Sequence, residues 1–333
     1  MRSLLQFLDS SVGRVLRYAI SIGLLAGFIL WVDWSEIARL RGQFATWPVF
    51  WAVILAGISY PLHAYRWWLL LRVQGLRLSF HWSHVVTWIG NFYSSFLLGG
   101  LGGDAARAYY VCRDAPEAKA GGLAAIAIDR LLGLLILLLI SLVAIIAKLG
   151  SLADNPAFRA FAWSSVAVLV AGTIASTVLL AKSPDQWPHW LRRYLGDSLS
   201  ARLSDFRRRT LAAPGVHLIA FSISVVVWLL DFISVWLLAL GVGLPLPFFE
   251  TCIAVSIAYA STALPISIGG HGVREGALLF VLGLFGLIGA AGPDRERALI
   301  LAVLVWAVTM IWSLFGGLVL VLTRQDRVVA PSP

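Results

Sequence analysis

The stretch SSFLLGGLGGDAAR, residues 94–107, reappears half a chain later as STALPISIGGHGVR, residues 261–274. Five of the fourteen positions are identical, and the offset between the two copies is 167 residues in a chain of 333. Each copy interrupts an apolar segment with glycines. Two matching halves with broken apolar segments are typical of membrane transporters built from repeats.

A second match supports this interpretation. The charged pair Asp129-Arg130 recurs at the same offset as Glu296-Arg297. We therefore expect one transmembrane domain over the whole chain, with repeat one at about 1–150 and repeat two at about 151–333.

The composition excludes an ordinary soluble domain, because 59% of the residues are hydrophobic and only 13% are charged. The net charge of +9 does not indicate nucleic acid, since the basic residues lie in loops between apolar runs. They are better explained as orientation signals and as contacts for anionic lipid headgroups. The two cysteines match no metal or disulfide spacing. The expected partners are thus membrane lipids, with no cofactor, metal or nucleic acid.

Apolar runs of about 20 residues are long enough to cross a bilayer as helices. Six segments satisfy this length: 16–33, 47–71, 119–147, 160–181, 216–241 and 298–322. Two shorter segments, 84–98 and 250–265, each run into a break rich in glycine or proline. The resulting fold class is an all-α polytopic membrane protein with about six crossing helices and two re-entrant helical hairpins.

The hairpin interpretation follows from the backbone groups that a break exposes. Hydrocarbon cannot satisfy these groups, so a break is tolerated only where it faces protein or a water-filled cavity. The polar path at the two breaks is expected to be lined by Gly102, Gly103, Gly269, Gly270 and Gly272, with Pro265 preventing a continuous second helix. The alternative is that residues 272–291 cross the membrane fully.

The distribution of Lys and Arg favours the hairpins. With both termini cytoplasmic, six crossings place 16 of these residues inside and 6 outside, whereas eight crossings give at best 13 and 9. Three crossings per half is an odd number, so the repeats are inverted. The expected location is the cell inner membrane. The arginine-rich loop at 182–210 is expected to lie on the lipid surface or to form a solvated linker.

Arg66 and Asp231 lie within predicted spans, where a charge is costly and needs a partner or a function. Arg66 follows a run that begins at Trp47, and its side chain could reach the interface. Asp231 has no charged neighbour in its own span. Because Arg66 and Asp231 occupy similar positions in the two halves, an ion pair between them is one hypothesis. A role of Asp231 in proton or ion coupling is the other.

Arg107 and Arg274 are the strongest candidates for binding a substrate. Each follows a glycine break near the start of a predicted half-helix. The free N–H groups of a helix N-terminus, together with the planar fork of an arginine, suit a phosphate group. Asp104 and Glu275 supply carboxylates for a cationic headgroup, or simply stabilise the helix N-termini.

Three further features complete the candidate site. His271, between glycines, is expected either to hydrogen-bond a backbone carbonyl or to gate by protonation. The pairs Asp129-Arg130 and Glu296-Arg297 are each expected to clamp the neighbouring hairpin. No motif of a hydrolase, metalloprotease or nucleotide-binding protein is present. Asp33 and Glu36 give only a weak indication of a transferase acting on polyprenyl-linked sugars.

At residues 97–107 and 265–276 the chain resembles the transmembrane family of lysylphosphatidylglycerol synthetases and flippases, typified by the flippase half of the multiple peptide resistance factor. The Arg66-Trp67 and Asp129-Arg130 positions fit the same pattern. Relatives that aminoacylate lipid carry a soluble C-terminal domain, and this chain ends about ten residues after its last predicted span. The resemblance therefore implies lipid movement without lipid aminoacylation.

The favoured hypothesis is a flippase, and not an enzyme, that moves a phosphate-headgroup lipid such as a phospholipid or a polyprenyl or hopanoid-type lipid. The alternatives are an intramembrane transferase and a non-catalytic partner of a lipid-synthesising or lipid-modifying enzyme.

Overall fold

The computed structural model describes residues 45–96, 102–152, 207–262, 267, 270–289 and 292–323, and scattered positions between 156 and 205. The described residues form helices and no strand. The predicted span at 16–33 and the candidate transferase residues Asp33 and Glu36 lie outside the described residues. Between 160 and 181 only scattered positions are described, and these are helical.

Four long helices match predicted crossings: α4 (Thr46–Val73), α7 (Lys119–Leu152), α11 (Pro214–Gly241) and α14 (Pro293–Thr323). Each contains an apolar window long enough to span a bilayer. The prediction of a polytopic all-α membrane protein is therefore confirmed. A short 3-10 turn, η2 (Pro116–Ala118), precedes α7.

Between the long helices lie two hairpins, which are the two predicted pairs of short segments. Hairpin one consists of α5 (Phe80–Phe96) and α6 (Gly102–Asp114), and hairpin two of α12 (Phe248–Ser261) and α13 (Val273–Leu284). At about 1.5 Å per residue, none of the four helices reaches the thickness of about 30 Å that a crossing needs. The alternative of a full crossing at 272–291 fails because α13 has only 12 residues.

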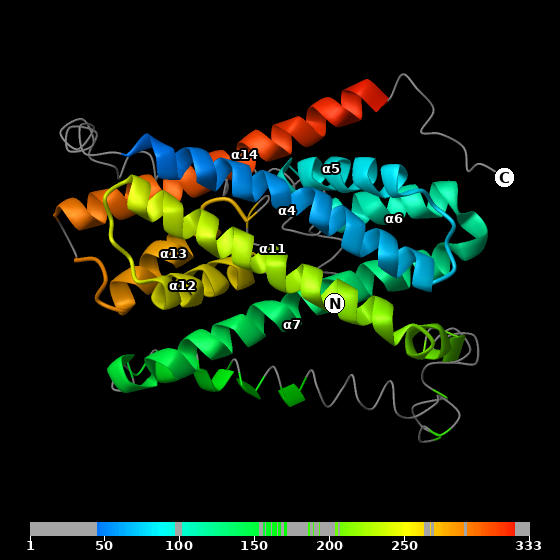
Figure 1. The fold of residues 1–333 in the computed structure, drawn as a ribbon, viewed down its shortest axis with the longest axis horizontal. Helices are drawn as coiled ribbons and strands as arrows, with labels where there is room; N and C mark the ends of the chain where they lie inside the picture. Colours follow the sequence, from blue (N-terminus) through cyan, green and yellow to red (C-terminus); the bar gives the residue numbers. More distant parts are fainter. Residues whose placement is uncertain are drawn as a thin grey trace.

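The two hairpins enter the molecule from opposite ends and point their tips at its middle (Figure 1). Within each hairpin the two helices pack against one another, and α4 packs along α11 between the hairpins. The order of elements is the same in both halves: long helix, short helix, break, short helix, long helix. This arrangement agrees with inverted repeats.

The repeat extends to individual hydrogen bonds where α4 and α11 end. Trp68 Nε1 donates to Leu78 O and Trp236 Nε1 donates to Leu246 O, both at 3.0 Å and 168 residues apart (236 minus 68). The turns between them also match, with Gly75 and Gly243 both in the left-handed region that glycine tolerates. The offset here is one residue longer than at the glycine breaks.

The second predicted match is not a structural equivalence. Asp129 lies ten residues after the start of α7, whereas Glu296 lies three residues after the start of α14. The connection before α14 is longer than the one before α7, so equal spacing along the chain does not place the two charged pairs at equal depth.

Candidate functional site at the meeting of the hairpin tips

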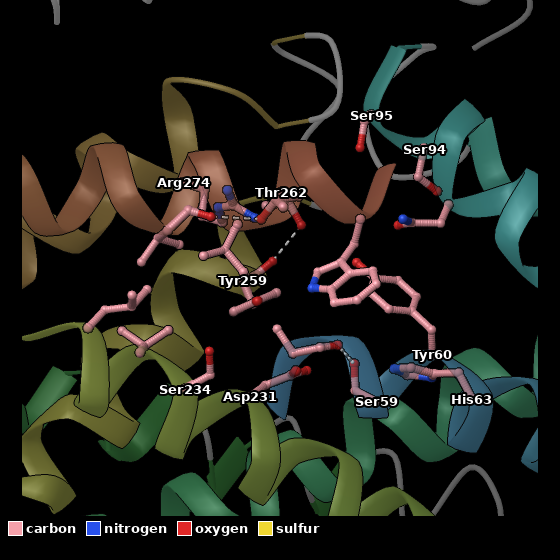
Figure 2. A pocket seen from close by; sticks show the side chains of 18 residues that line it. Ser59, Tyr60, His63, Ser94, Ser95, Asp231, Ser234, Tyr259, Thr262 and Arg274 are labelled. Carbon is pink, nitrogen blue, oxygen red and sulfur yellow. Dashed lines mark hydrogen bonds between the residues drawn. The ribbon is translucent and has the colours of Figure 1, made fainter. Parts of the chain in front are cut away.

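A cavity of about 220 Å³ lies where the hairpin tips approach the crossing of α4 and α11 (Figure 2). Six helices contribute to its wall. The polar lining residues are Ser59, Tyr60, His63, Asn91, Ser94, Ser95, Asp231, Ser234, Tyr259, Thr262, Arg274 and Thr309. A polar chamber of this kind in an otherwise apolar bundle is a typical binding site in helical membrane proteins.

The two tips touch directly. The Nε2 atom of His271, in the break of hairpin two, is 3.0 Å from the backbone oxygen of Ser95, at the end of α5. Nε2 therefore donates to this carbonyl, which is the backbone contact that the sequence offered as one alternative for His271. The contact joins the two repeats at the edge of the cavity.

Arg274 is held at the cavity wall by the residue that follows it. The guanidinium donates to Glu275 Oε1 at 2.6 Å, and Glu275 Oε2 accepts the backbone N–H of Gly272 at 2.8 Å. Glu275 therefore does two things: one carboxylate oxygen caps the N-terminus of α13, and the other orients the Arg274 side chain. The guanidinium also lies 5.8 Å from the ring centre of Tyr259. Gly270 and Gly272, both with positive φ, form the turn that starts α13.

Asp231 lies at the other side of the same chamber (Figure 2). It lines the cavity together with Ser234 from its own helix and with Ser59, which lies beside its carboxylate. No described residue forms an ion pair with Asp231. Arg274 is a nearby cation that acts on Asp231 electrostatically, and it is already paired with Glu275.

The hypothesis of an ion pair between Arg66 and Asp231 is wrong. Arg66 Nε donates to Asp129 at 2.7 Å, and its Nη1 donates to Ser224 at 2.9 Å. Both partners of the Arg66–Asp129 pair are at least 96% buried. Asp231 and Asp129 both lie inside apolar spans, so the sequence does not show which of them pairs with Arg66. The packing of α4 against α7 brings Asp129 to Arg66.

Arg107 joins this second cluster and is not a lining residue of the cavity. Its Nη1 donates to the other oxygen of Asp129 at 3.2 Å, and its guanidinium lies over the ring of Trp67 at 4.9 Å. Asp129 thus sits between two guanidinium groups. Of the two arginines that the sequence offered for binding a substrate, Arg274 faces the cavity and Arg107 does not.

The predicted clamp on hairpin one is present. Asp129 and Arg130 of α7 pair with Arg107 and Asp104 of α6, respectively. In the second half, Arg297 pairs with Asp294 one turn earlier on its own helix, at 3.1 Å.

The remaining predicted glycines serve close packing. Gly102 and Gly103 are buried at the start of α6, and Gly103 faces the backbone of Gly90 so closely that a Cβ would lie 2.7 Å from its oxygen. Pro265 and Gly269 lie outside the described residues.

Sequence reasoning missed most of the cavity wall, including Tyr60, Asn91 and Trp312. A signal was available on α4, where Ser59, His63 and Arg66 follow one another at intervals of four and three residues. Such a polar stripe on an apolar span marks the helix face that turns away from lipid.

The fold and the chamber define a class: a multi-pass helical membrane protein in which two helical hairpins, one from each half of the chain, meet at a polar site. Residues 15–317 match the family model described as the lysylphosphatidylglycerol synthase TM region, so the chain belongs to this family, as its motifs suggested. A search of curated proteins gave no match. The family places the protein in membrane lipid biology.

Proposed function

We propose that this protein is a lipid translocase, and not an enzyme, that moves lipids with a phosphate-containing headgroup between the leaflets of the inner membrane. The observation that carries the proposal is the polar cavity between the hairpin tips, with the Arg274 guanidinium in its wall. Arginine is the side chain best suited to bind phosphate with two parallel hydrogen bonds.

The cavity has about the scale of a headgroup and not of a whole lipid, so the acyl chains would remain in the bilayer. Arg274 would bind the phosphate, while hydroxyl groups such as those of Tyr60 and Thr262 would replace the water that the headgroup loses on entry. These side chains already face the chamber, so they could contact a headgroup without a large movement.

The inverted halves support a route through the membrane. In transporters of this architecture, one half rocks against the other and opens a central site to each face in turn. Here the contact between His271 and Ser95 joins the tips. Breaking this contact would let the hairpin tips separate, and the cavity would then open to one leaflet. The charge distribution favours cytoplasmic termini. In that orientation hairpin one would open from inside and hairpin two from outside.

The proposal is tested with purified protein in liposomes that contain labelled phosphatidylglycerol. We expect faster transbilayer movement of this lipid than in empty liposomes, and no acceleration for a labelled diacylglycerol, which lacks the phosphate. Equal acceleration of both lipids, or of neither, would contradict the proposal.

Substitution of the two motif arginines sharpens this test. Arg274→Ala is expected to slow movement by about tenfold to a hundredfold, the value of one or two charge-assisted hydrogen bonds. Arg107→Ala is expected to slow movement less than Arg274→Ala does, because Arg107 binds Asp129 outside the cavity. A larger loss of transport for Arg107→Ala, at equal stability, would instead place the phosphate at hairpin one.

A further inference from the structure

Asp231, a half-buried acid of α11, is unusual because it faces a cavity and forms no ion pair with any described residue. Among the described residues that line the chamber, Asp231 is the one acid and Arg274 the one arginine. Asp129 pairs with two arginines and Glu250 with Lys148. The hydroxyl of Ser59 lies beside Asp231, and the nearby cation Arg274 is already paired with Glu275.

The charges around the cavity explain why this matters. Glu275 neutralises Arg274 before any ligand arrives. A phosphate bound to Arg274 therefore brings one uncompensated negative charge into a chamber of about 220 Å³. An ionised Asp231 in the same chamber would add a second. Two like charges at close range in a medium of low dielectric constant repel strongly, and a bound proton on the carboxyl removes this repulsion.

We propose that Asp231 and Arg274 form one proton-linked anion site, which binds the headgroup phosphate and a proton together. This inference rests on the proposed function and names the coupled ion. The phosphate binds at the Arg274 guanidinium, and the proton binds at the Asp231 carboxyl. Because linkage is reciprocal, the proton raises the affinity for the anionic lipid by the same factor as the lipid raises the affinity for the proton. A pH gradient then sets the direction of net lipid movement.

The other titratable groups around Asp231 do not replace it. Those that face the cavity are Tyr60 and His63 from α4, Tyr259 from α12 and Arg274 from α13. Tyrosine stays neutral and arginine stays charged around neutral pH. The described lining residues of α5 and α14 are not acids or bases. On α7, which also packs against α11, the nearby acid Asp129 is already held by Arg66.

Among the described residues that line the cavity, His63 is the one alternative proton carrier, and its geometry disfavours it. Its Nδ1 atom lies 3.3 Å from Nη2 of Arg66. The guanidinium is a donor only, so Nδ1 accepts and carries no proton. A cationic imidazole at this place would face a second cation.

The experiment measures binding, so it does not depend on turnover. The protein is placed in phosphatidylcholine nanodiscs, and labelled phosphatidylglycerol, whose phosphodiester stays ionised throughout, is titrated between roughly pH 5.5 and pH 8.5. We expect the affinity to fall as the pH rises, by up to about tenfold per pH unit for one linked proton. Asp231→Asn imitates the protonated carboxyl, so it should bind with the low-pH affinity at every pH.

Two control variants should keep the pH dependence: His63→Gln, and Asp205→Asn at an acid outside the chamber that pairs with Arg208 and Arg209. A second measurement uses the wild type alone. Addition of lipid near pH 7.5 should produce an infrared band of a protonated carboxyl group, so the proposal remains testable even if Asp231→Asn does not fold.

The outcomes separate the two proposals. If phosphatidylglycerol binding does not depend on Arg274 at any pH, the proposed function is wrong. If binding depends on Arg274 but not on pH, or if Asp231→Asn keeps the wild-type pH dependence, or if no carboxyl band appears, this inference is overturned and the proposed function stands. Loss of the pH dependence in His63→Gln alone would assign the proton to His63.

Discussion

The two hairpins carry the same motif but use its arginine differently. In hairpin one, Arg107 turns to Asp129 on α7, where Arg66 of α4 also binds, and the group is buried between three helices. In hairpin two, Arg274 pairs with its sequence neighbour Glu275 and faces the cavity. The same residue type at the same place in the repeat therefore fastens one hairpin to the scaffold and equips the other for a ligand.

The difference lies in where the balancing carboxylate comes from. Asp129 belongs to another helix, so the ion pairs it forms hold α6 against α7 and α4. Glu275 belongs to the same helix as Arg274, so its ion pair leaves hairpin two free of that restraint. The two repeats therefore become asymmetric because the arginine of one hairpin pairs with a carboxylate on another helix, whereas the arginine of the other hairpin pairs with a carboxylate on its own helix.

The largest expected effect comes from breaking the three-residue cluster. Asp129→Asn leaves the guanidinium groups of Arg66 and Arg107 buried without a counter-charge. Loss of one partner of a buried ion pair costs about 3–5 kcal/mol, so we expect a large fall in the midpoint of thermal unfolding in detergent.

The matched control removes an exposed ion pair. Arg208→Ala breaks the pair with Asp205, in which the Arg208 side chain is 79% exposed. Such surface pairs contribute little, so the unfolding midpoint should hardly change. Equal effects of the two variants would mean that the cluster does not fasten hairpin one.

A methyl group tests the close packing of hairpin one. In Gly103→Ala, the added Cβ would lie 2.2 Å from Ser94 Oγ and 2.7 Å from the backbone oxygen of Gly90. The backbone contact cannot yield without separating α5 from α6, so we expect a cost of about 1–3 kcal/mol. The control is Gly276→Ala in α13, where no atom lies within 4 Å of the added Cβ. It should be neutral or slightly stabilising, because alanine favours helix.

The sequence predicted the architecture well because each signal was local. The run at 47–71 became α4 at Thr46–Val73, and the run at 216–241 became α11 at Pro214–Gly241. Length and hydropathy suffice for such helices. Glycine and proline likewise marked the ends of the short helices, since they act on their own backbone.

Partner choice and the cavity wall could not be predicted in the same way. Arg66 and Asp129 are 63 residues apart, and their contact depends on the angle at which α4 and α7 pack. Trp312 reaches the cavity because its ring fits over Gly57, where any Cβ would clash with it. Such contacts depend on the relative rotation of helices, which periodicity does not determine.

A smaller effect is expected from the carboxylate of hairpin two. Glu275→Gln keeps only one acceptor oxygen, so either Arg274 or the Gly272 N–H loses its acceptor to the amide NH2 group, while the guanidinium remains at the cavity wall. We expect a cost of about 1 kcal/mol, the usual value of a weakened helix cap, and so less than for Asp129→Asn. Because the negative charge beside Arg274 is lost, phosphatidylglycerol should bind more tightly than to the wild type. Weaker binding would show that Glu275 orients the guanidinium more than it neutralises it.

The smallest effect concerns the contact that joins the hairpins. His271→Ala removes the hydrogen bond to Ser95 O, which contributes about 0.5–1.5 kcal/mol. At this size the protein should remain folded, but the tips should separate more often, since the equilibrium between joined and open tips shifts by roughly threefold to tenfold. Spin labels at Phe96, which is exposed at the end of α5, and at Gly276 would report the separation as a second, longer distance.

His81→Ala, at an exposed histidine near the start of α5, should leave the distance distribution unchanged. If His271→Ala also leaves it unchanged, then the apolar packing around Trp306, whose ring lies 6.5 Å from that of His271, joins the tips instead.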